Sequence, residues 1–202
     1  MVWVSGAKLA AASANAGCLG VIGAGSMKLE VLEEQITKAQ KLTTKPLAIN
    51  LPLLYHGVDK QIECALSKGI KIFITSAGSP KKWTPLLKKE GCKVIHVCSS
   101  PMLAKKCEDA GVDMLIAEGF EAGGHNGREE LTTMTLTPQV VDSVKVPVIA
   151  AGGIADARTM MAAFSLGAKG VQMGTRFLMT KESRAHNNYK NLLLEADGGS
   201  TE

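Results

Sequence analysis

The chain has 202 residues, of which 46% are hydrophobic, 21% are charged and only 4% are aromatic. This length fits one large domain or two small ones, and the apolar fraction is too high for a disordered protein. The net charge of +4 is too small to predict nucleic-acid binding, because the lysines are spread over predicted helix surfaces. The 21 glycines do not cluster with proline or serine, which indicates ordered turns rather than a linker.

The amino-terminal part contains an uncharged run from Leu9 to Met27, and an Ala-rich helix is predicted over residues 5–16, overlapping the start of this run. The run approaches the length of a membrane span, but it contains four glycines and Asn15, so we expect no membrane association. The five cysteines form no C-x-x-C pair, and each has an apolar or helical context. We therefore expect buried, reduced thiols in a cytoplasmic protein, with no metal site.

Seven short apolar runs, read in chain order, predict buried strands. They begin at Cys18, Leu47, Ile70, Lys93, Val112, Pro147 and Gly170. Segments of helical period separate them, at residues 28–41, 58–68, 81–89, 102–109, 137–144 and 155–166. Five strands follow a glycine suited to end a helix in the left-handed conformation, at Gly17, Gly69, Gly91, Gly111 and Gly167.

Continuous apolar strands that alternate with helices predict a parallel sheet covered by helices. Units this uniform favour a (β/α)8 TIM barrel over an open, doubly wound sheet. Only seven strands are found, however, and the chain opens with a helix. We therefore expect an incomplete barrel that lacks its first strand, built as a single domain over residues 1–202 of a longer chain.

Glycine-rich loops follow the last two predicted strands, where barrels commonly bind phosphate. They read Ala151-Gly-Gly-Ile154 and Gly174-Thr-Arg176. Glycines leave backbone N–H groups accessible to an anion, and Thr175 adds a hydroxyl donor. Tight turns would also use glycine, but two such loops on adjacent strands favour a phosphate-bearing ligand.

The longest loop begins at Glu118 and contains His125 beside Gly123 and Gly124. A histidine at a barrel mouth can exchange protons near neutral pH, which makes His125 a candidate catalytic residue. The alternative is a histidine that only braces the loop. His96 lies within a strand, where it either lines the barrel mouth or packs in the core, while His56 and His186 are expected on the surface or in loops.

Three stretches of the sequence resemble one enzyme family. These stretches are Ala117-Glu-Gly-Phe-Glu-Ala-Gly-Gly-His-Asn-Gly127, Ala150-Ala-Gly-Gly-Ile-Ala-Asp156 and Gly170-Val-Gln-Met-Gly-Thr-Arg-Phe177. They resemble the nitronate monooxygenases, formerly called 2-nitropropane dioxygenases, and equally the flavin-dependent enoyl-acyl-carrier-protein reductases of type II. The likeness covers nearly the whole chain, but these motifs separate the two activities poorly.

The resemblance implies a barrel that holds FMN without a covalent bond. Family members also continue well past the position of Glu202, so we expect the carboxyl-terminal region to be missing as well. His125 matches the active-site histidine of the family. The cofactor-binding residues that the resemblance implies are Asn50, Glu118, Gly123, Gly124, Ala151, Gly152, Gly153, Gly174 and Thr175.

Two reactions follow from the resemblance. A nitronate monooxygenase oxidises alkyl nitronates with dioxygen to carbonyl compounds and nitrite, whereas an enoyl reductase uses NADH or NADPH to reduce an enoyl thioester. We place nitronate oxidation first and enoyl reduction second, and a truncated, inactive FMN-binding fragment is the alternative of another class. A relative of inosine-monophosphate dehydrogenase fits less well, because no cysteine occupies a loop after a strand. A homodimer is compatible with the sequence, which does not determine the oligomeric state.

Overall fold

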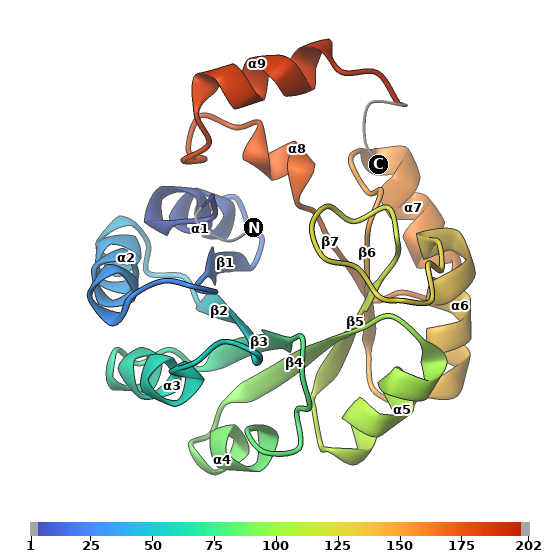
Figure 1. Ribbon diagram of the computed structural model, residues 1–202, viewed down its shortest axis with the longest axis horizontal. Coiled ribbons are helices and arrows are strands. Elements are labelled where there is room, and N and C mark those ends of the chain that lie inside the picture. The colour runs from blue at the N-terminus through green and yellow to red at the C-terminus, as the bar shows by residue number, and fades with distance from the viewer. Residues whose placement is uncertain (1–3, 199–202) are drawn as a thin grey trace.

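The computed structural model describes residues 4–198 and has seven parallel strands enclosed by helices (Figure 1). The strands are β1 (Gly20–Gly23), β2 (Leu47–Pro52), β3 (Ile72–Ser76), β4 (Lys93–Cys98), β5 (Met114–Glu118), β6 (Val148–Ala151) and β7 (Gly170–Gln172). The helices are α1 (Ala7–Asn15), α2 (Leu29–Leu42), α3 (Val58–Ser67), α4 (Thr84–Lys89), α5 (Pro101–Asp109), α6 (Thr133–Ser143), α7 (Ala157–Ser165), α8 (Thr175–Leu178) and α9 (Asn187–Glu195).

The strands lie in the sheet in their order along the chain, and the sheet curls so that the helices cover its outer face (Figure 1). This is an incomplete (β/α)8 barrel, as predicted from the alternation of apolar runs and helical segments. Within residues 4–198, β1 and β7 are the two edges of the sheet and do not pair with each other. The barrel is therefore open between its first and last observed strands.

Short segments near both ends of the described chain meet beside β1. The carbonyl of Ser5 accepts a hydrogen bond from the Gly23 N–H at 3.0 Å, and its hydroxyl donates to the Val21 carbonyl at 2.5 Å. The Arg184 N–H, in the segment after α8, donates to the Val4 carbonyl at 3.4 Å. The outer edge of β1 is thus covered near its carboxyl end by the chain itself.

The five glycines predicted to end helices adopt the left-handed backbone conformation. Their φ angles lie between 68° and 95°, a region that residues with a Cβ atom rarely occupy. The structure therefore confirms the turn prediction at Gly17, Gly69, Gly91, Gly111 and Gly167. Each turn returns the chain from a helix to the next strand.

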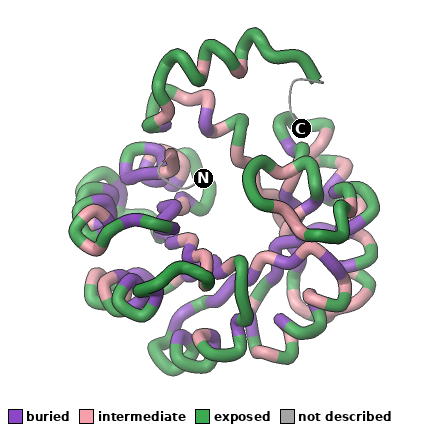
Figure 2. The backbone as a smooth tube through the Cα atoms, viewed as in Figure 1, coloured by how far each residue is buried: buried purple, intermediate pink, exposed green. Residues whose placement is uncertain are grey.

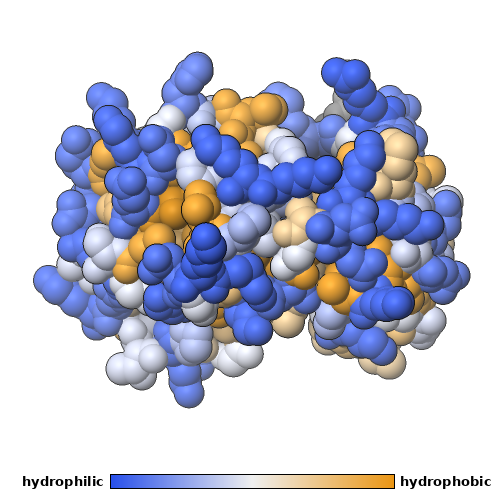
Figure 3. All heavy atoms as spheres, turned by 90° about the horizontal axis from the view of Figure 1, so that it is seen from below, coloured by the Kyte–Doolittle hydropathy of each residue, from blue (hydrophilic) through white to orange (hydrophobic). Residues whose placement is uncertain are grey.

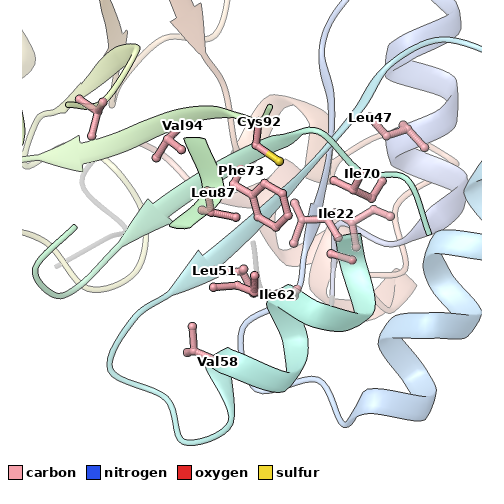
Figure 4. Packing of buried hydrophobic residues seen from close by; sticks show 14 of the residues in the cluster. Ile22, Leu47, Leu51, Val58, Ile62, Ile70, Phe73, Leu87, Cys92 and Val94 are labelled. Atoms are coloured by element: carbon pink, nitrogen blue, oxygen red, sulfur yellow. The ribbon is translucent and has the colours of Figure 1, made fainter. Parts of the chain in front are cut away.

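The core has two layers because alternate residues of each strand face opposite sides of the sheet. Outward-facing side chains such as Ile22, Leu51 and Phe73 pack against the helices (Figure 4). A smaller cluster fills the barrel interior and includes Ala48, Ile74, Ile95, Ile116 and Ala151. Burial follows the strands and inner helix faces, while α9 is mostly exposed (Figure 2). The face in Figure 3 is mostly hydrophilic, with smaller hydrophobic areas between the charged side chains.

Helix α6 differs from its predicted bounds. From its helical period we expected it to begin at Thr137, but it begins at Thr133 and contains Pro138 in its interior. The Glu121 carboxylate accepts hydrogen bonds from the Thr133 N–H at 2.8 and 3.1 Å and so caps the start of the helix. A cap from twelve residues upstream leaves no local sequence signal. Helices α8 and α9 were also absent from the prediction.

The cysteine prediction is partly wrong. Cys92, Cys98 and Cys107 are buried, and Cys64 is half-buried, but Cys18 is exposed because it lies in the turn between α1 and β1. All five are free thiols. Burial raises the pKa of Cys98 to about 12 and that of Cys107 to about 11, so both remain protonated at neutral pH. Among residues 4–198, no helix is long and apolar enough to cross a membrane.

Candidate functional site

The carboxyl ends of β5, β6 and β7 form one row across the sheet. Glu118 pairs in register with Ala151, and Ala151 pairs with Gln172. All three face the barrel interior, because Ile116 and Ile149, two residues earlier on their strands, belong to the interior cluster. A carboxylate and an amide therefore flank a small residue at the end of the barrel where such folds place their sites.

Glu118 is the ionisable group of this row. Its side chain is partly enclosed, and burial raises the pKa of the carboxyl. The group can accept hydrogen bonds from polar N–H or O–H groups of a ligand. Asn50 lies at the interior face of β2, where its amide makes a long contact of 3.5 Å with the Ile74 carbonyl. The structure thus places both predicted residues at the carboxyl end of the barrel, on strands β5 and β2.

The loop after β6 contains Gly152 and Gly153, with φ angles of 106° and 63°. A Cβ atom on Gly152 would lie 2.7 Å from Thr133 Oγ1 and 3.0 Å from the Gly119 carbonyl oxygen. One on Gly153 would lie 3.3 Å from Glu121 Cβ. Packing within the protein and backbone conformation therefore require these two glycines, in addition to any need for space around a phosphate.

The helices that follow the two glycine-rich loops have different amino termini. Helix α7 is capped by Asp156, which accepts the N–H groups of Arg158 and Thr159. Hydrogen bonds from the Arg158 side chain and the Thr159 N–H lower the pKa of Asp156 to about 2. Helix α8 begins after Gly174 and has no side-chain cap. An external anion therefore finds unshared N–H groups at α8, whereas a carboxylate already occupies the start of α7.

The long loop between β5 and α6 carries His125, which is exposed. Asn126 braces the loop from within, because its amide donates to the carbonyls of Phe120 and Ala122 at 3.0 and 2.9 Å. A Cβ atom on Gly123 or Gly124 would meet nothing within 4 Å, although the φ of Gly124 is 103°. The loop is therefore open on the side of these glycines. The catalytic role of His125 remains a prediction.

His96 lies outside this site. It shares the outward face of β4 with Val94 and Cys98, and its side chain is 3% exposed. Its Nδ1 lies 2.7 Å from Thr75 Oγ1, and burial lowers the pKa of the ring to about 4 despite a hydrogen bond to the Gly78 backbone. Of the two positions considered for His96, the core is correct. His56 is exposed, and His186 caps α9 by accepting the Asn188 N–H.

Three residues of this region were missed in the sequence. Gln172 belongs to a quoted motif, but alternation along the strand only places it on the face opposite Val171 and does not tell which face is the interior. Glu121 and Thr133 lie twelve residues apart in a loop without periodicity. No local pattern indicates their contact.

The fold and the position of these motifs place the chain in the class of (β/α)8-barrel proteins. The family model for nitronate monooxygenase matches residues 1–59 and 53–202. A probable nitronate monooxygenase of Staphylococcus saprophyticus is 36% identical, over 94% of this chain and 66% of its own length. The chain belongs to the nitronate monooxygenase family.

Other relatives carry different names. A (3aS,4S,5R,7aS)-5-hydroxy-7a-methyl-1-oxo-octahydro-1H-indene-4-carboxyl-CoA dehydrogenase of Rhodococcus jostii is 37% identical, over 96% of this chain and 54% of the relative. The structure of FabK from Thermotoga maritima has a TM-score of 0.94 and 45% identity, over 98% of this chain and 63% of that one. Nitroalkane oxidase from Streptomyces ansochromogenes has a TM-score of 0.89 and 27% identity, over 95% and 67%. The chain thus spans about half to two thirds of these relatives.

Proposed function

We propose that the protein is an FMN-dependent oxidoreductase whose site lies at the carboxyl ends of β5, β6 and β7. The observation that carries the proposal is the arrangement of three family motifs on these adjacent strands, in the register Glu118, Ala151 and Gln172. The uncapped start of α8 beside the glycine loop fits a phosphate group. The open side of the His125 loop fits a flat ligand.

In this proposal different residues bind different parts of FMN. Backbone N–H groups of Gly152, Gly153 and Gly174, with the Thr175 hydroxyl, hold the phosphate, and Ala151 leaves room above the barrel interior. Glu118 and Asn50 form hydrogen bonds with polar atoms of the rest of FMN. Gly123 and Gly124 allow the loop after β5 to approach the cofactor. When bound, FMN supplies the electron-transfer chemistry, and the protein supplies position and proton transfer.

The first reaction that we propose is oxidation of alkyl nitronates to carbonyl compounds and nitrite, with dioxygen as oxidant. The matching family model and several curated relatives carry the name of this activity. His125 then takes a proton from the neutral nitroalkane or donates a hydrogen bond to the nitro group. This step requires a neutral imidazole close to the substrate carbon.

The second candidate is reduction of an enoyl thioester with NADH or NADPH, which the 45% identity to FabK favours. The name of the Rhodococcus relative also specifies a coenzyme A thioester. His125 then orients the thioester carbonyl or assists protonation beside it. The two candidates share the cofactor and differ in the electron donor.

Flavin titration tests the shared part of the proposal. We expect FMN to raise the melting temperature of the purified chain, because a ligand that binds only the folded state stabilises that state. We also expect the flavin fluorescence to be quenched on binding. A chain that is colourless as purified and whose melting temperature does not respond to FMN would show that the proposal is wrong.

Anaerobic mixing of the FMN complex separates the two reactions. Bleaching of the flavin by NADH or NADPH supports the reductase, whereas bleaching by an alkyl nitronate alone supports the monooxygenase.

The variant His125→Ala should retain FMN and lose at least tenfold in turnover of a neutral nitroalkane or enoyl thioester, as expected for removal of a general acid or base. His56→Ala is the matched control, because His56 is likewise exposed in a loop at the carboxyl end of a strand. Full activity of His125→Ala would exclude the catalytic role.

A further inference from the structure

Thr133, the first residue of α6, contacts both loops of the candidate site. Its backbone N–H donates to the Glu121 carboxylate at 2.8 Å, in the loop after β5. Its hydroxyl lies 2.9 Å from the carbonyl of Gly152, in the loop after β6, and 3.3 Å from the carbonyl of Ala151, the last residue of that strand. One residue thus bonds to the His125 loop through its main chain and to the glycine loop through its side chain.

The hydroxyl has a single proton, which limits how these contacts are shared. Glu121 Oε2 also lies 3.1 Å from Thr133 Oγ1, but Glu121 already receives the Thr133 N–H at a shorter distance. None of these three acceptors can donate, so the single proton of the Thr133 hydroxyl goes to the nearest of them, the Gly152 carbonyl at 2.9 Å. The geometry therefore assigns the O–H to the glycine loop and the N–H to the His125 loop.

The surroundings leave little room for another arrangement. The Thr133 side chain is 9% exposed, and Cβ atoms on Gly119 and Gly152 would lie 2.1 and 2.7 Å from its Oγ1. The lack of a Cβ atom at Gly119 and Gly152, one in each loop, therefore leaves the space that the Thr133 hydroxyl occupies between the two loops. The neighbouring Thr132 shows the contrast, because its exposed hydroxyl bonds only to Thr135 within the same turn.

We propose that Thr133 is a positioning residue that couples the loop carrying His125 to the glycine loop that receives the ligand phosphate. This inference rests on the proposed function for its ligand, but the coupling is a property of the protein alone. Loss of the hydroxyl disconnects the glycine loop while the Glu121 cap of α6 remains. Phosphate binding is then weakened, and the ring of the cofactor is held as before.

The first test compares FMN with riboflavin, which lacks the phosphate. We expect Thr133→Val to weaken FMN binding about tenfold, the effect of one lost hydrogen bond, and to change riboflavin binding less than twofold. Thr133→Ser, which keeps the hydroxyl, should restore the FMN affinity, and Thr132→Val is the matched control. Equal losses for both ligands, or none for either, would overturn the proposal.

The second test needs no ligand and therefore separates this proposal from the flavin proposal. Amide hydrogen exchange should accelerate in peptides covering residues 150–156 of Thr133→Val, but not in Thr133→Ser or Thr132→Val. Unchanged exchange in that segment contradicts the coupling, whether or not the wild-type chain binds FMN. If valine prevents folding, Thr133→Ala removes the same hydroxyl without placing a methyl group against two carbonyls.

Discussion

The two walls of the barrel differ in how they are packed. On strands β1 to β4, the outward-facing Ile22, Ile49, Phe73 and Val94 are all fully buried beneath helices. On the other side, β7 has no fully buried residue, α7 buries only Ala163, and α9 buries none. Position at the edge of the sheet does not explain the difference, because β1 is an edge strand as well and its Ile22 is fully buried.

This contrast distinguishes the well-packed part of the barrel from the part that carries the glycine-rich loops. The well-packed wall fixes the barrel, while the glycine loop after β6 and the start of α8 belong to the wall with fewer buried contacts. Segments with little buried apolar surface open locally at low free energy. Glu118 lies on β5, at the border between the two walls.

The largest effect is expected for a pair of phenylalanine variants. Phe73 is 0% exposed on β3, whereas Phe164 is 40% exposed on α7. We expect Phe73→Ala to lower the free energy of unfolding by about 3 to 5 kcal/mol, because it leaves a cavity in the core. Phe164→Ala should cost less than about 1 kcal/mol. Urea denaturation measures both, and equal losses would show that the walls are packed alike.

An intermediate effect is expected from the buried His96. Its pKa falls from 6.5 to about 4 on folding, so the unfolded chain binds more protons between these values. Burial of the neutral His96 ring therefore does not reduce the free energy of unfolding above pH 6.5. As the pH falls from 6.5 towards 4, that free energy decreases by about 3 kcal/mol.

Thermal denaturation between pH 7 and 4 tests this prediction. The variant His96→Gln should lose less stability over that range than the wild type, and His56→Gln, changed at an exposed histidine, should match the wild type. A pH dependence that is the same in all three proteins would contradict the burial of His96.

The smallest effect is expected at Asp113, at the amino end of β5. Burial raises the pKa of this carboxyl, but hydrogen bonds from Lys88, Val94 and Lys93 outweigh burial and lower the pKa overall. Asp113→Asn should destabilise the protein by about 1 kcal/mol, an effect that disappears as the wild-type group is protonated in acid. Asp156→Asn on the exposed α7 is the control and should cost less, because asparagine also caps helices.

Most of the fold could be predicted because its signals are local. The five helix-ending glycines and the seven apolar runs each depend on neighbouring residues, and all appear where expected. The start of α6 could not be predicted, since its cap, Glu121, comes from a distant part of the loop. Residue type alone likewise left His96 open, because a strand histidine can face either layer.

For the candidate site, the sequence motifs identified which loops lie together, but not the side-chain contacts that fix their conformations. The motifs containing Glu118, Ala151 and Gly174 lie on adjacent strands, as a parallel sheet requires. The unequal amino termini of α7 and α8 depend on side-chain orientation at Asp156, which spacing does not reveal. The requirement for glycine at position 152 similarly depends on Thr133, a residue without any motif.

The hydrogen bonds of Ser5 along the edge of β1 also affect whether another chain can pair with the open sheet. An exposed strand edge invites addition of a foreign strand, which leads to aggregation. At β1, Ser5 bonds to Val21 and Gly23, and the backbone of α1 comes within 1.9 Å of where a Gly20 Cβ would lie. At β7, pairing is limited to Gly170–Gln172, because α8 begins at Thr175. The hydrogen bonds of Ser5 at β1 and the shortness of β7 therefore disfavour intermolecular pairing at the two edges. A closed barrel avoids such pairing by bonding its first strand to its last.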